Sequence, residues 1–145
     1  MQTRIISDVI AERPLFSAGK EMTVRAACCL MAENKIGALL VVENGRIAGI
    51  FTERDALNKI LAGRLDPDTT LLSQVMVSNP QTIRADKPLG YALQFMFDGG
   101  FRHVPVVDEN GAALGMVSAR DALGQDMLQL ERDLQFREHL EENIA

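Results

Sequence analysis

The chain has 145 residues and a formal net charge of -5, so it has room for one compact domain or for two halves that share a core. The acidic balance argues against a dedicated nucleic-acid binder, because phosphate contacts need a basic face. The longest apolar run, residues 36–42, is too short to span a bilayer, and Asp8 and Glu12 are atypical of a signal peptide, so we expect a cytoplasmic protein that binds no membrane.

The first half of the chain alternates helical and extended patterns. Apolar residues recur at helical spacing near the N-terminus, and Pro14 ends that segment. A later apolar run is continuous, which is typical of a strand buried on both faces. Asn44 and Gly45 then favour a tight hairpin turn, because they tolerate positive φ. In chain order, the expected elements are a helix at 5–11, an extended piece at 16–17, a helix at 21–34, strands at 37–42 and 47–51, and a helix at 53–62.

The second half repeats this order after a polar linker. One unit of about sixty residues buries little surface by itself, so we expect the two units to pack sheet to sheet. The expected elements are a helix at 70–77, a strand at 81–84, a helix at 87–98, strands at 103–107 and 112–117 around a turn at 108–111, and one long helix from 119 to about 142.

A seven-residue motif occurs twice in the chain. Residues 49–55 read GIFTERD and residues 115–121 read GMVSARD, so both copies have the pattern G-h-h-[S/T]-x-R-D, where h is apolar. Each copy follows a strand pattern and leads into a helix pattern. The similarity extends upstream, where Val-Val at 41–42 matches Val-Val at 106–107. A repeat of this length predicts two copies of one small unit that face each other and form two related clefts.

This tandem pattern resembles a pair of cystathionine-β-synthase (CBS) domains, often called a Bateman module, over residues 5–123. The resemblance implies an α/β (α+β) fold in which two β-α-β-β-α repeats, related by a pseudo-two-fold axis, pack sheet to sheet. It also implies a cleft on each side of the paired sheets. We expect the repeats at 1–63 and 71–123, a linker at 64–70, and a long C-terminal helical extension at 124–145.

Members of this family bind AMP, ADP, ATP, S-adenosylmethionine or NAD-type ligands, and some bind nothing known. The resemblance therefore implies a regulatory module that senses an adenosyl ligand, has no obligatory cofactor, and changes the activity of an unidentified partner protein. Such pairs commonly dimerise into a flat disk, so we expect a homodimer. The alternative is a ligand-free scaffold or dimerisation module that acts through protein–protein interaction.

The hydroxyl and carboxylate groups of the repeated motif suit a ribose. Thr52 and Ser118 stand at a strand-to-helix junction, where a hydroxyl can cap the helix. Asp55 and Asp121 follow one helical turn later, and a carboxylate can accept both hydroxyls of a ribose. The alternative is that all of these residues only cap their helices. Because the motif occurs twice, we expect at least one copy to bind a ribose.

Basic residues near the second apolar strand suit a phosphate. Arg102 and His103 resemble phosphate ligands of the family, and a planar guanidinium donates two parallel hydrogen bonds. Lys35 is the basic residue at the corresponding place of the first repeat, and Arg120 lies inside the second motif. The alternatives are a solvated charge at the strand start for Arg102, a polar edge residue for His103, and an exposed helix position for Arg120.

In the family the clefts are built crosswise, so that the motif of one repeat faces the first strand of the other. The resemblance therefore puts Thr82 with Thr52 and Asp55, and we favour the second motif's cleft for phosphorylated ligands. Phe16 stands where the second repeat has Thr82, and this departure supports the scaffold alternative. The expected base contacts and cleft walls are Phe16, Ser17, Ile36, Gly37, Val104 and Met116.

Residues that carry other chemistry are sparse. Cys28 and Cys29 are adjacent in a helical pattern without Cys or His partners at metal spacing, so we expect reduced thiols and no metal site. The sequence shows no nucleophile-and-base pattern, so we expect no enzymatic activity. At the C-terminus, Leu123, Met127 and Leu130 continue to Leu134 at helical spacing, which suits a helix that covers its own domain or one that reaches across a dimer.

Overall fold

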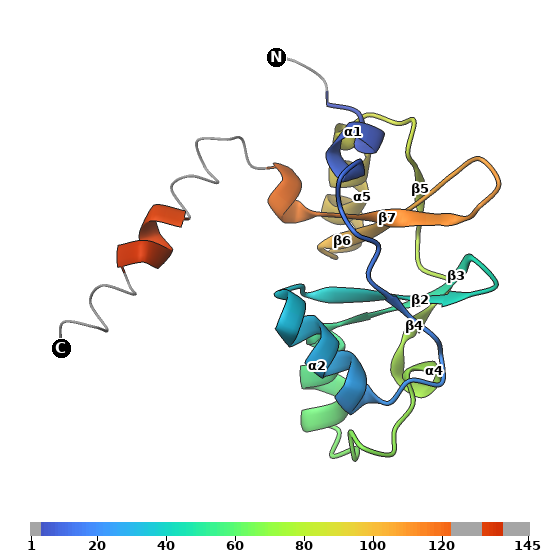
Figure 1. Ribbon diagram of the computed structural model, residues 1–145, viewed down its shortest axis with the longest axis vertical. Coiled ribbons are helices and arrows are strands. Elements are labelled where there is room, and N and C mark those ends of the chain that lie inside the picture. Colours follow the sequence, from blue (N-terminus) through green and yellow to red (C-terminus); the bar gives the residue numbers. More distant parts are fainter. Residues whose placement is uncertain (1–3, 123–131, 138–145) are drawn as a thin grey trace.

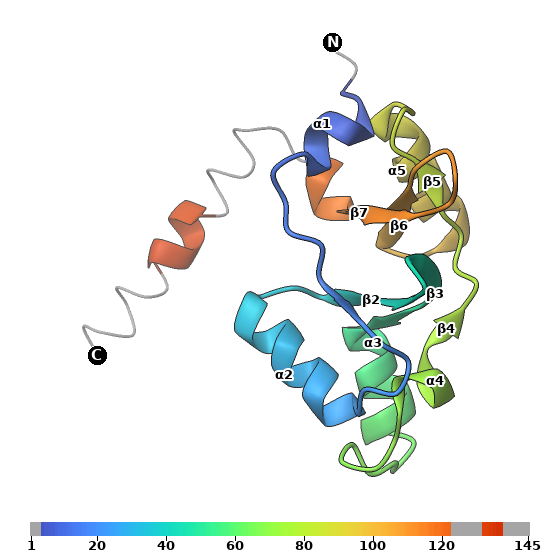
Figure 2. The ribbon, with the colours of Figure 1, turned by 45° about the vertical axis from the view of Figure 1, so that its right-hand side comes forward.

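The computed structural model describes residues 4–122 and 132–137 of the chain. In this part, two sheets face each other in the middle of the molecule, and helices cover the outer face of each sheet (Figure 1, Figure 2). The layers therefore follow the order helix, sheet, sheet, helix, which is the sheet-to-sheet arrangement expected from the repeat. Within the described ranges, no helix is both long and apolar enough to cross a membrane.

The first unit contains β1 (Ser17–Ala18), α2 (Val24–Asn34), β2 (Ala38–Glu43), β3 (Arg46–Thr52), α3 (Glu53–Asp55), the π-helix η1 (Ala56–Leu61), α4 (Leu72–Val75) and β4 (Val77–Ser78). Its sheet has the order β1-β2-β3-β4, with β1 parallel to β2 and the other neighbours antiparallel. Asn44 and Gly45 have positive φ in the β2–β3 turn, as the Asn-Gly pair predicted.

The second unit contains α1 (Ile6–Ile10), β5 (Ile83–Arg84), α5 (Leu89–Gly99), β6 (His103–Val107), β7 (Ala113–Ser118) and the 3-10 helix η2 (Ala119–Ala122). Its sheet has the order β5-β6-β7, with β5 parallel to β6 and β6 antiparallel to β7. The two units share this pattern down to a register shift in the central strand, after Val41 in one and after Val106 in the other. The pseudo-two-fold repeat of the sequence is therefore a repeat of the fold.

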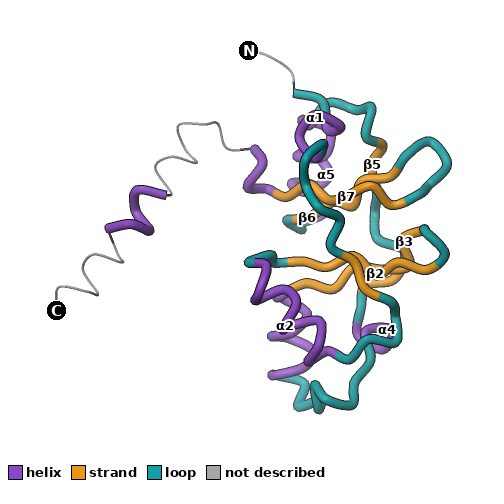
Figure 3. The backbone as a smooth tube through the Cα atoms, in the orientation of Figure 1, coloured by secondary structure: helices purple, strands orange, loops and turns teal. Residues whose placement is uncertain are grey.

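Each unit contains a short helix from the opposite repeat. Ile6 and Ile10 of α1 are buried in the core of the second unit, together with Val104. In the same way, Leu72 and Val75 of α4, from the second repeat, are buried in the core of the first unit. The chain must therefore cross from the second unit to the first directly after α1, and Figure 3 shows this crossover as a loop along both sheets.

The turns of the two hairpins contact each other at one end of the sheets. The backbone N–H of Ala113 donates to the carbonyl of Gly45 at 3.0 Å, and Arg46 forms an isolated bridge with Ala112. Both turns lie on the same side of the molecule in Figure 3. These bonds hold the units together at the hairpin end, so the strand-to-helix junctions lie at the opposite end.

Two predicted helices need correction. The helix expected at 70–77 ends at Val75, because Met76 adopts an extended conformation and residues 77–78 form β4. β4 then pairs with β3 opposite Gly49 and Ile50, so tertiary pairing overrides the local helical pattern. The helix expected at 53–62 begins as α3 and continues as the π-helix η1.

The C-terminal segment is only partly described. The helix expected from residue 119 begins as the single 3-10 turn η2, and residues 132–137 are helical. Leu134 and Phe136 in that helical stretch are exposed at 51% and 63%. The other residues predicted for the helical seam, at positions 123, 127 and 130, lie outside the described residues.

Candidate functional site

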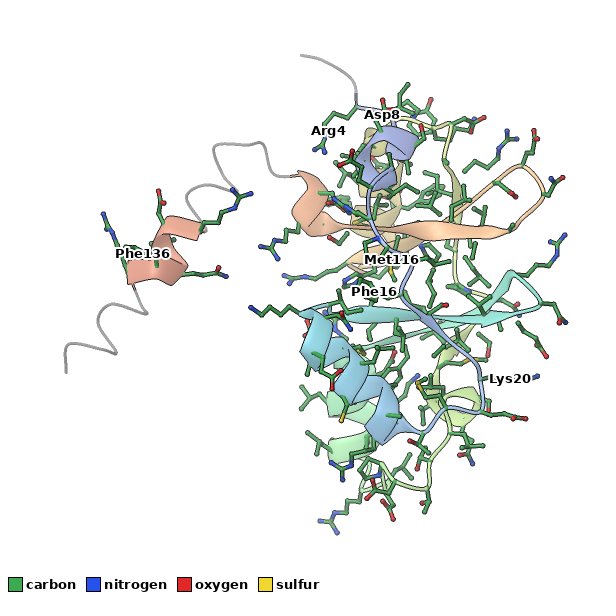
Figure 4. The ribbon with its side chains drawn as sticks, viewed as in Figure 1. Arg4, Asp8, Phe16, Lys20, Met116 and Phe136 are labelled. Carbon is green, nitrogen blue, oxygen red and sulfur yellow. The ribbon has the colours of Figure 1, made fainter. Side chains whose placement is uncertain are left out.

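The larger cleft between the units lies beside the second strand-to-helix junction. We call it the Asp121 cleft, and its volume is about 570 Å³. The crossover segment forms one side, and β7 with η2 forms the other. Figure 4 shows Phe16 and Met116 from these two sides between the sheets. Of the predicted site residues, this cleft brings together Phe16, Lys35, Ile36, Gly37, Arg102, His103, Met116, Ser118, Arg120 and Asp121.

The second cleft lies beside the first strand-to-helix junction. We call it the Asp55 cleft, and its volume is about 440 Å³. It is closed on the opposite side by residues 79–81, which lead into β5. The predicted site residues on its surface are Gly37, Thr52, Asp55, Arg102 and His103. Both clefts therefore combine the motif of one repeat with the segment before the first strand of the other.

Three predicted residues line neither cleft. Val104 is fully buried in the core of the second unit, because its side chain points away from the first sheet. Ser17 and Thr82 are exposed, and their neighbours Phe16 and Gln81 take the places on the cleft walls. The lining segments, residues 13–16 and 79–81, end before β1 and β5 begin, so both predicted residues lie just beyond the clefts.

The structure resolves the register of the basic residues. Lys35 ends α2 in the left-handed conformation, at φ 55°, and Gly100 ends α5 in the same way at φ 70°. The residue of the first repeat that corresponds to Arg102 is therefore Gly37. Matching backbone hydrogen bonds support this correspondence. The Glu53 N–H donates to the Gly37 carbonyl, and the Ala119 N–H donates to the Arg102 carbonyl. Lys35 nevertheless reaches the Asp121 cleft.

Asp55 forms a capping box with Thr52. One carboxylate oxygen accepts the Thr52 backbone N–H at 3.0 Å and the Thr52 hydroxyl at 3.1 Å. The Thr52 hydroxyl accepts the Asp55 backbone N–H in return. The other carboxylate oxygen lies 3.2 Å from Lys59 Nζ, which also donates to the Val75 carbonyl. The capping role predicted as the alternative is therefore present, and Asp55 is 92% buried by its internal partners and neighbours, with 8% of its surface exposed.

Asp121 has a different partner. One carboxylate oxygen accepts the Ser118 backbone N–H at 2.8 Å, which repeats the bond from the Thr52 backbone N–H to Asp55. Both carboxylate oxygens also accept hydrogen bonds from the guanidinium of Arg13, at 3.0 and 2.5 Å. Arg4 donates to the backbone carbonyl of Asp121. Sequence reasoning missed Arg13, because nothing in the pattern around it indicates a partner so far along the chain.

The Arg13 pair determines how Asp121 titrates. Burial pushes the pKa of the Asp121 carboxyl upward, but the hydrogen bonds from Arg13 and from the Ser118 backbone outweigh it, so this pKa lies below its usual value. A carboxyl whose pKa is lower in the folded state stabilises the fold above its unfolded-state pKa. That stabilisation is lost as the pH falls through the folded-state pKa.

We therefore expect Asp121→Asn to lower the free energy of unfolding, by an amount that does not change with pH near neutrality. The gap in unfolding free energy between this variant and the parent protein should shrink as the pH falls below about 4, the unfolded-state pKa of an Asp, and through the lower pKa of the folded carboxyl. Urea unfolding at several pH values measures this gap. Asp68→Asn is the control, because it breaks the exposed Arg25–Asp68 pair and should leave stability nearly unchanged at every pH. A gap for Asp121→Asn that stays constant to about pH 3 would contradict the assignment.

A wall shared by both clefts separates the two motifs. It consists of Gly37, Glu53, Arg102 and His103, which line both cavities. A Cβ on Gly37 would lie 3.2 Å from a Glu53 carboxylate oxygen and 3.6 Å from the His103 ring, so a larger residue would crowd this wall. Burial lowers the pKa of His103 despite the opposing effect of Glu53, so its imidazole is neutral at pH 7 and offers a hydrogen bond rather than a charge. The sequence reasoning also missed Glu53.

The two clefts differ in their charged side chains. The Asp121 cleft is lined by four cationic residues, Arg13, Lys35, Arg102 and Arg120, and by the acidic residues Glu53 and Asp121. The Asp55 cleft is lined by Arg54 and Arg102 together with Glu53 and Asp55, so its charges balance. A cleft with an excess of cations concentrates anions. The Asp121 cleft is therefore the more suitable of the two for a phosphate group.

Comparison with solved structures gives a similar architecture and a similar pairing of units. A CBS domain protein from Pyrobaculum aerophilum, in a structure described as complexed with AMP, has a TM-score of 0.78 at 29% identity and covers 88% of this chain and 97% of its own. The CBS-domain containing protein of Agrobacterium tumefaciens has a TM-score of 0.72 at 31% identity, covering 81% of this chain and 95% of its own.

Comparison with curated sequences gives longer relatives. The meiotically up-regulated gene 70 protein of Schizosaccharomyces pombe is 36% identical over 114 residues, which are 79% of this chain but 16% of that protein. A CBS domain-containing protein of Arabidopsis thaliana is also 36% identical, with 21% of its length matched. The sequence further matches the model of the CBS domain twice, at residues 6–62 and 72–126. The chain therefore belongs to the CBS domain family, as a tandem pair of CBS domains.

Proposed function

We propose that the chain is a regulatory module that binds an adenosyl ligand in the clefts between its two CBS domains. The observation that carries this proposal is the crosswise construction of both clefts. Each one joins a hydroxyl and a carboxylate at a strand-to-helix junction with the opposite repeat, and Arg102 and His103 lie between them. The similar protein from Pyrobaculum aerophilum, described as complexed with AMP, supports an adenosine nucleotide as the ligand.

We propose that a phosphorylated ligand, such as AMP, ADP or ATP, binds in the Asp121 cleft. Its four cationic side chains support this choice, and the planar guanidinium of Arg102 can donate two parallel hydrogen bonds to a phosphate. The balanced charges of the Asp55 cleft suit a ligand with less negative charge, such as S-adenosylmethionine. A nucleotide found only in the Asp55 cleft would overturn this ranking.

Ligand binding would change the relative orientation of the two units or of two subunits. A ligand in either cleft contacts both repeats, so it can favour one arrangement by its difference in affinity for the two arrangements. We propose that the chain acts as a cytoplasmic homodimer, with no catalytic activity of its own, and that the shift changes the activity of a protein partner.

One observation favours a second candidate, a CBS scaffold that binds no nucleotide. Both motif carboxylates already have internal partners, since Asp55 is paired with Thr52 and Lys59, and Asp121 with Arg13. A ribose would have to replace these bonds or add to them. The scaffold would act through protein–protein interaction alone.

A calorimetric titration separates the two candidates. The protein is unfolded, freed of bound ligand, refolded, and titrated with AMP, ADP, ATP, S-adenosylmethionine and NADH. Saturable binding at micromolar concentration supports the sensor, and the stoichiometry tells whether one cleft or both are used. If none of these ligands binds, and circular dichroism shows that the protein is folded, the result supports the scaffold.

Replacing the motif carboxylates tests the ribose assignment. We expect Asp55→Ala or Asp121→Ala to weaken binding at its own cleft roughly ten- to a hundred-fold, because a charge-assisted hydrogen bond contributes about 1.5–3 kcal/mol. The same titration measures the effect. Asp86→Ala is the matched control, since its exposed carboxylate pairs with Arg84 outside both clefts and its loss should leave affinity unchanged. Unchanged affinity in both motif variants would exclude the ribose role.

A further inference from the structure

The carboxylate of Asp121 is occupied by a residue from the opposite side of its cleft. Arg13 comes from the crossover segment and holds both carboxylate oxygens, in the bidentate geometry that makes such pairs strong. A ribose diol would use the same two oxygens as acceptors. With Arg13 in this position, the Asp121 side chain is only 9% exposed.

Arg13 itself lies at the surface. Its side chain is 45% exposed, and residues 11–15 of the crossover segment are all exposed. No core contact has to break when the guanidinium leaves Asp121. Among the described residues, the Asp55 cleft has no equivalent ion pair across it, because the Asp55 carboxylate pairs with Lys59 from the following helix.

We propose that Arg13 is a specificity-determining residue that competes with the ribose for Asp121 and makes this cleft select phosphorylated over unphosphorylated nucleosides. This inference rests on the proposed function. A ligand takes the Asp121 carboxylate only by breaking the ion pair, which leaves the guanidinium without its partner. A ligand phosphate in the same cleft gives the released guanidinium a new anion to bind. An unphosphorylated nucleoside offers no such replacement, so it binds against the full cost of the broken pair.

The same exchange connects ligand binding to the fold. Arg13 lies on the segment that joins α1 in the second unit to β1 in the first. A transfer of its guanidinium from Asp121 to a ligand phosphate moves this connection and leaves the hairpin contacts at the other end of the sheets in place. Selection of the phosphate and a change at the crossover would therefore have the same cause.

The test compares adenosine with AMP in calorimetric titrations of the full chain. The variants are Arg13→Gln, which removes the charge, and Arg13→Lys, which keeps a charge that cannot hold both carboxylate oxygens in parallel. Each is measured alone and in an Asp55→Ala background that weakens the other cleft. Arg25→Gln is the matched control, because it breaks another bidentate Arg–Asp pair, with Asp68, and neither residue lines a cleft.

The quantity compared is the ratio of the adenosine Kd to the AMP Kd. We expect Arg13→Gln to lower this ratio roughly ten-fold or more, with tighter adenosine binding, and Arg13→Lys to give an intermediate ratio. Arg25→Gln should leave it unchanged. Adenosine binding that appears only in Arg13→Gln also supports the inference. A residue that only stabilised the fold would change both affinities together.

Two results would overturn the inference, and they are distinguishable. If the parent protein binds AMP and Arg13→Gln leaves the ratio unchanged, the role of Arg13 fails and the proposed function remains. If neither the parent nor any variant binds a nucleoside or nucleotide, the proposed function fails and the inference fails with it.

Discussion

Phe51→Ala should lower the free energy of unfolding by about 3–5 kcal/mol, which is the usual cost of removing a buried phenyl ring. Phe51 is fully buried on β3 and, within residues 4–122 and 132–137, is the largest side chain with no exposed surface. It packs in the first core with residues from α2, β2 and α4, among them Leu39 and Leu72. The truncated side chain would leave a cavity between elements that come from both sequence repeats.

Urea unfolding followed by far-ultraviolet circular dichroism measures this loss, because the chain has no Trp and one Tyr to serve as a fluorescent probe. Phe97→Ala is the matched control, since Phe97 on α5 is 85% exposed and the same truncation leaves no cavity there. A loss below about 1 kcal/mol for Phe51→Ala would show that the first core is not packed as described.

Gly49→Ala should lower the free energy of unfolding by about 1–3 kcal/mol, through crowding rather than through backbone conformation. A Cβ at this position would lie 2.6 Å from Met76 Sδ and 2.9 Å from the Val77 carbonyl oxygen. The Met76 side chain can move, but the Val77 carbonyl belongs to β4, which pairs with β3 at this glycine. The methyl group would therefore push β4 away from the sheet.

The same unfolding experiment measures this variant. Gly90→Ala in α5 is the control, because a Cβ there meets nothing within 4 Å. Alanine at a helical position with free space should raise stability by about 0.4–1 kcal/mol. Equal effects of the two substitutions, or a neutral Gly49→Ala, would contradict the close approach of β4 to β3.

The repeated motif predicted the local structure of the first junction correctly, and at the second junction it predicted the bond from the Asp carboxylate back to the strand end. Thr52 caps α3 and accepts from Asp55, and the Ser118 N–H donates to Asp121, as a Ser/Thr-x-x-Asp pattern favours. The Asn-Gly turn also formed as predicted. These features depend on residues within a few positions of each other, so the sequence pattern contains the information that they need.

The errors occurred where a partner from elsewhere in the chain decided the outcome. Residues 76–77 continue an apolar helical pattern, yet Met76 is extended, and Val77 and Ser78 pair with β3. Thr82 and Ser17 miss the clefts by one position, because the packing of residues 13–16 and 79–81 along the cleft walls ends just before them. The sequence does not record that packing.

By itself, the sequence determined that the chain is two copies of one unit, that each copy has a capped strand-to-helix junction, and that the copies face each other. Local spacing and hydrophobic periodicity are sufficient for those conclusions. Only the tertiary structure decided that α1 and α4 exchange units and that Arg13 holds Asp121, 108 positions away. Contacts at that separation arise from how the two sheets pack, and side chains with several possible partners find the one that packing brings within reach.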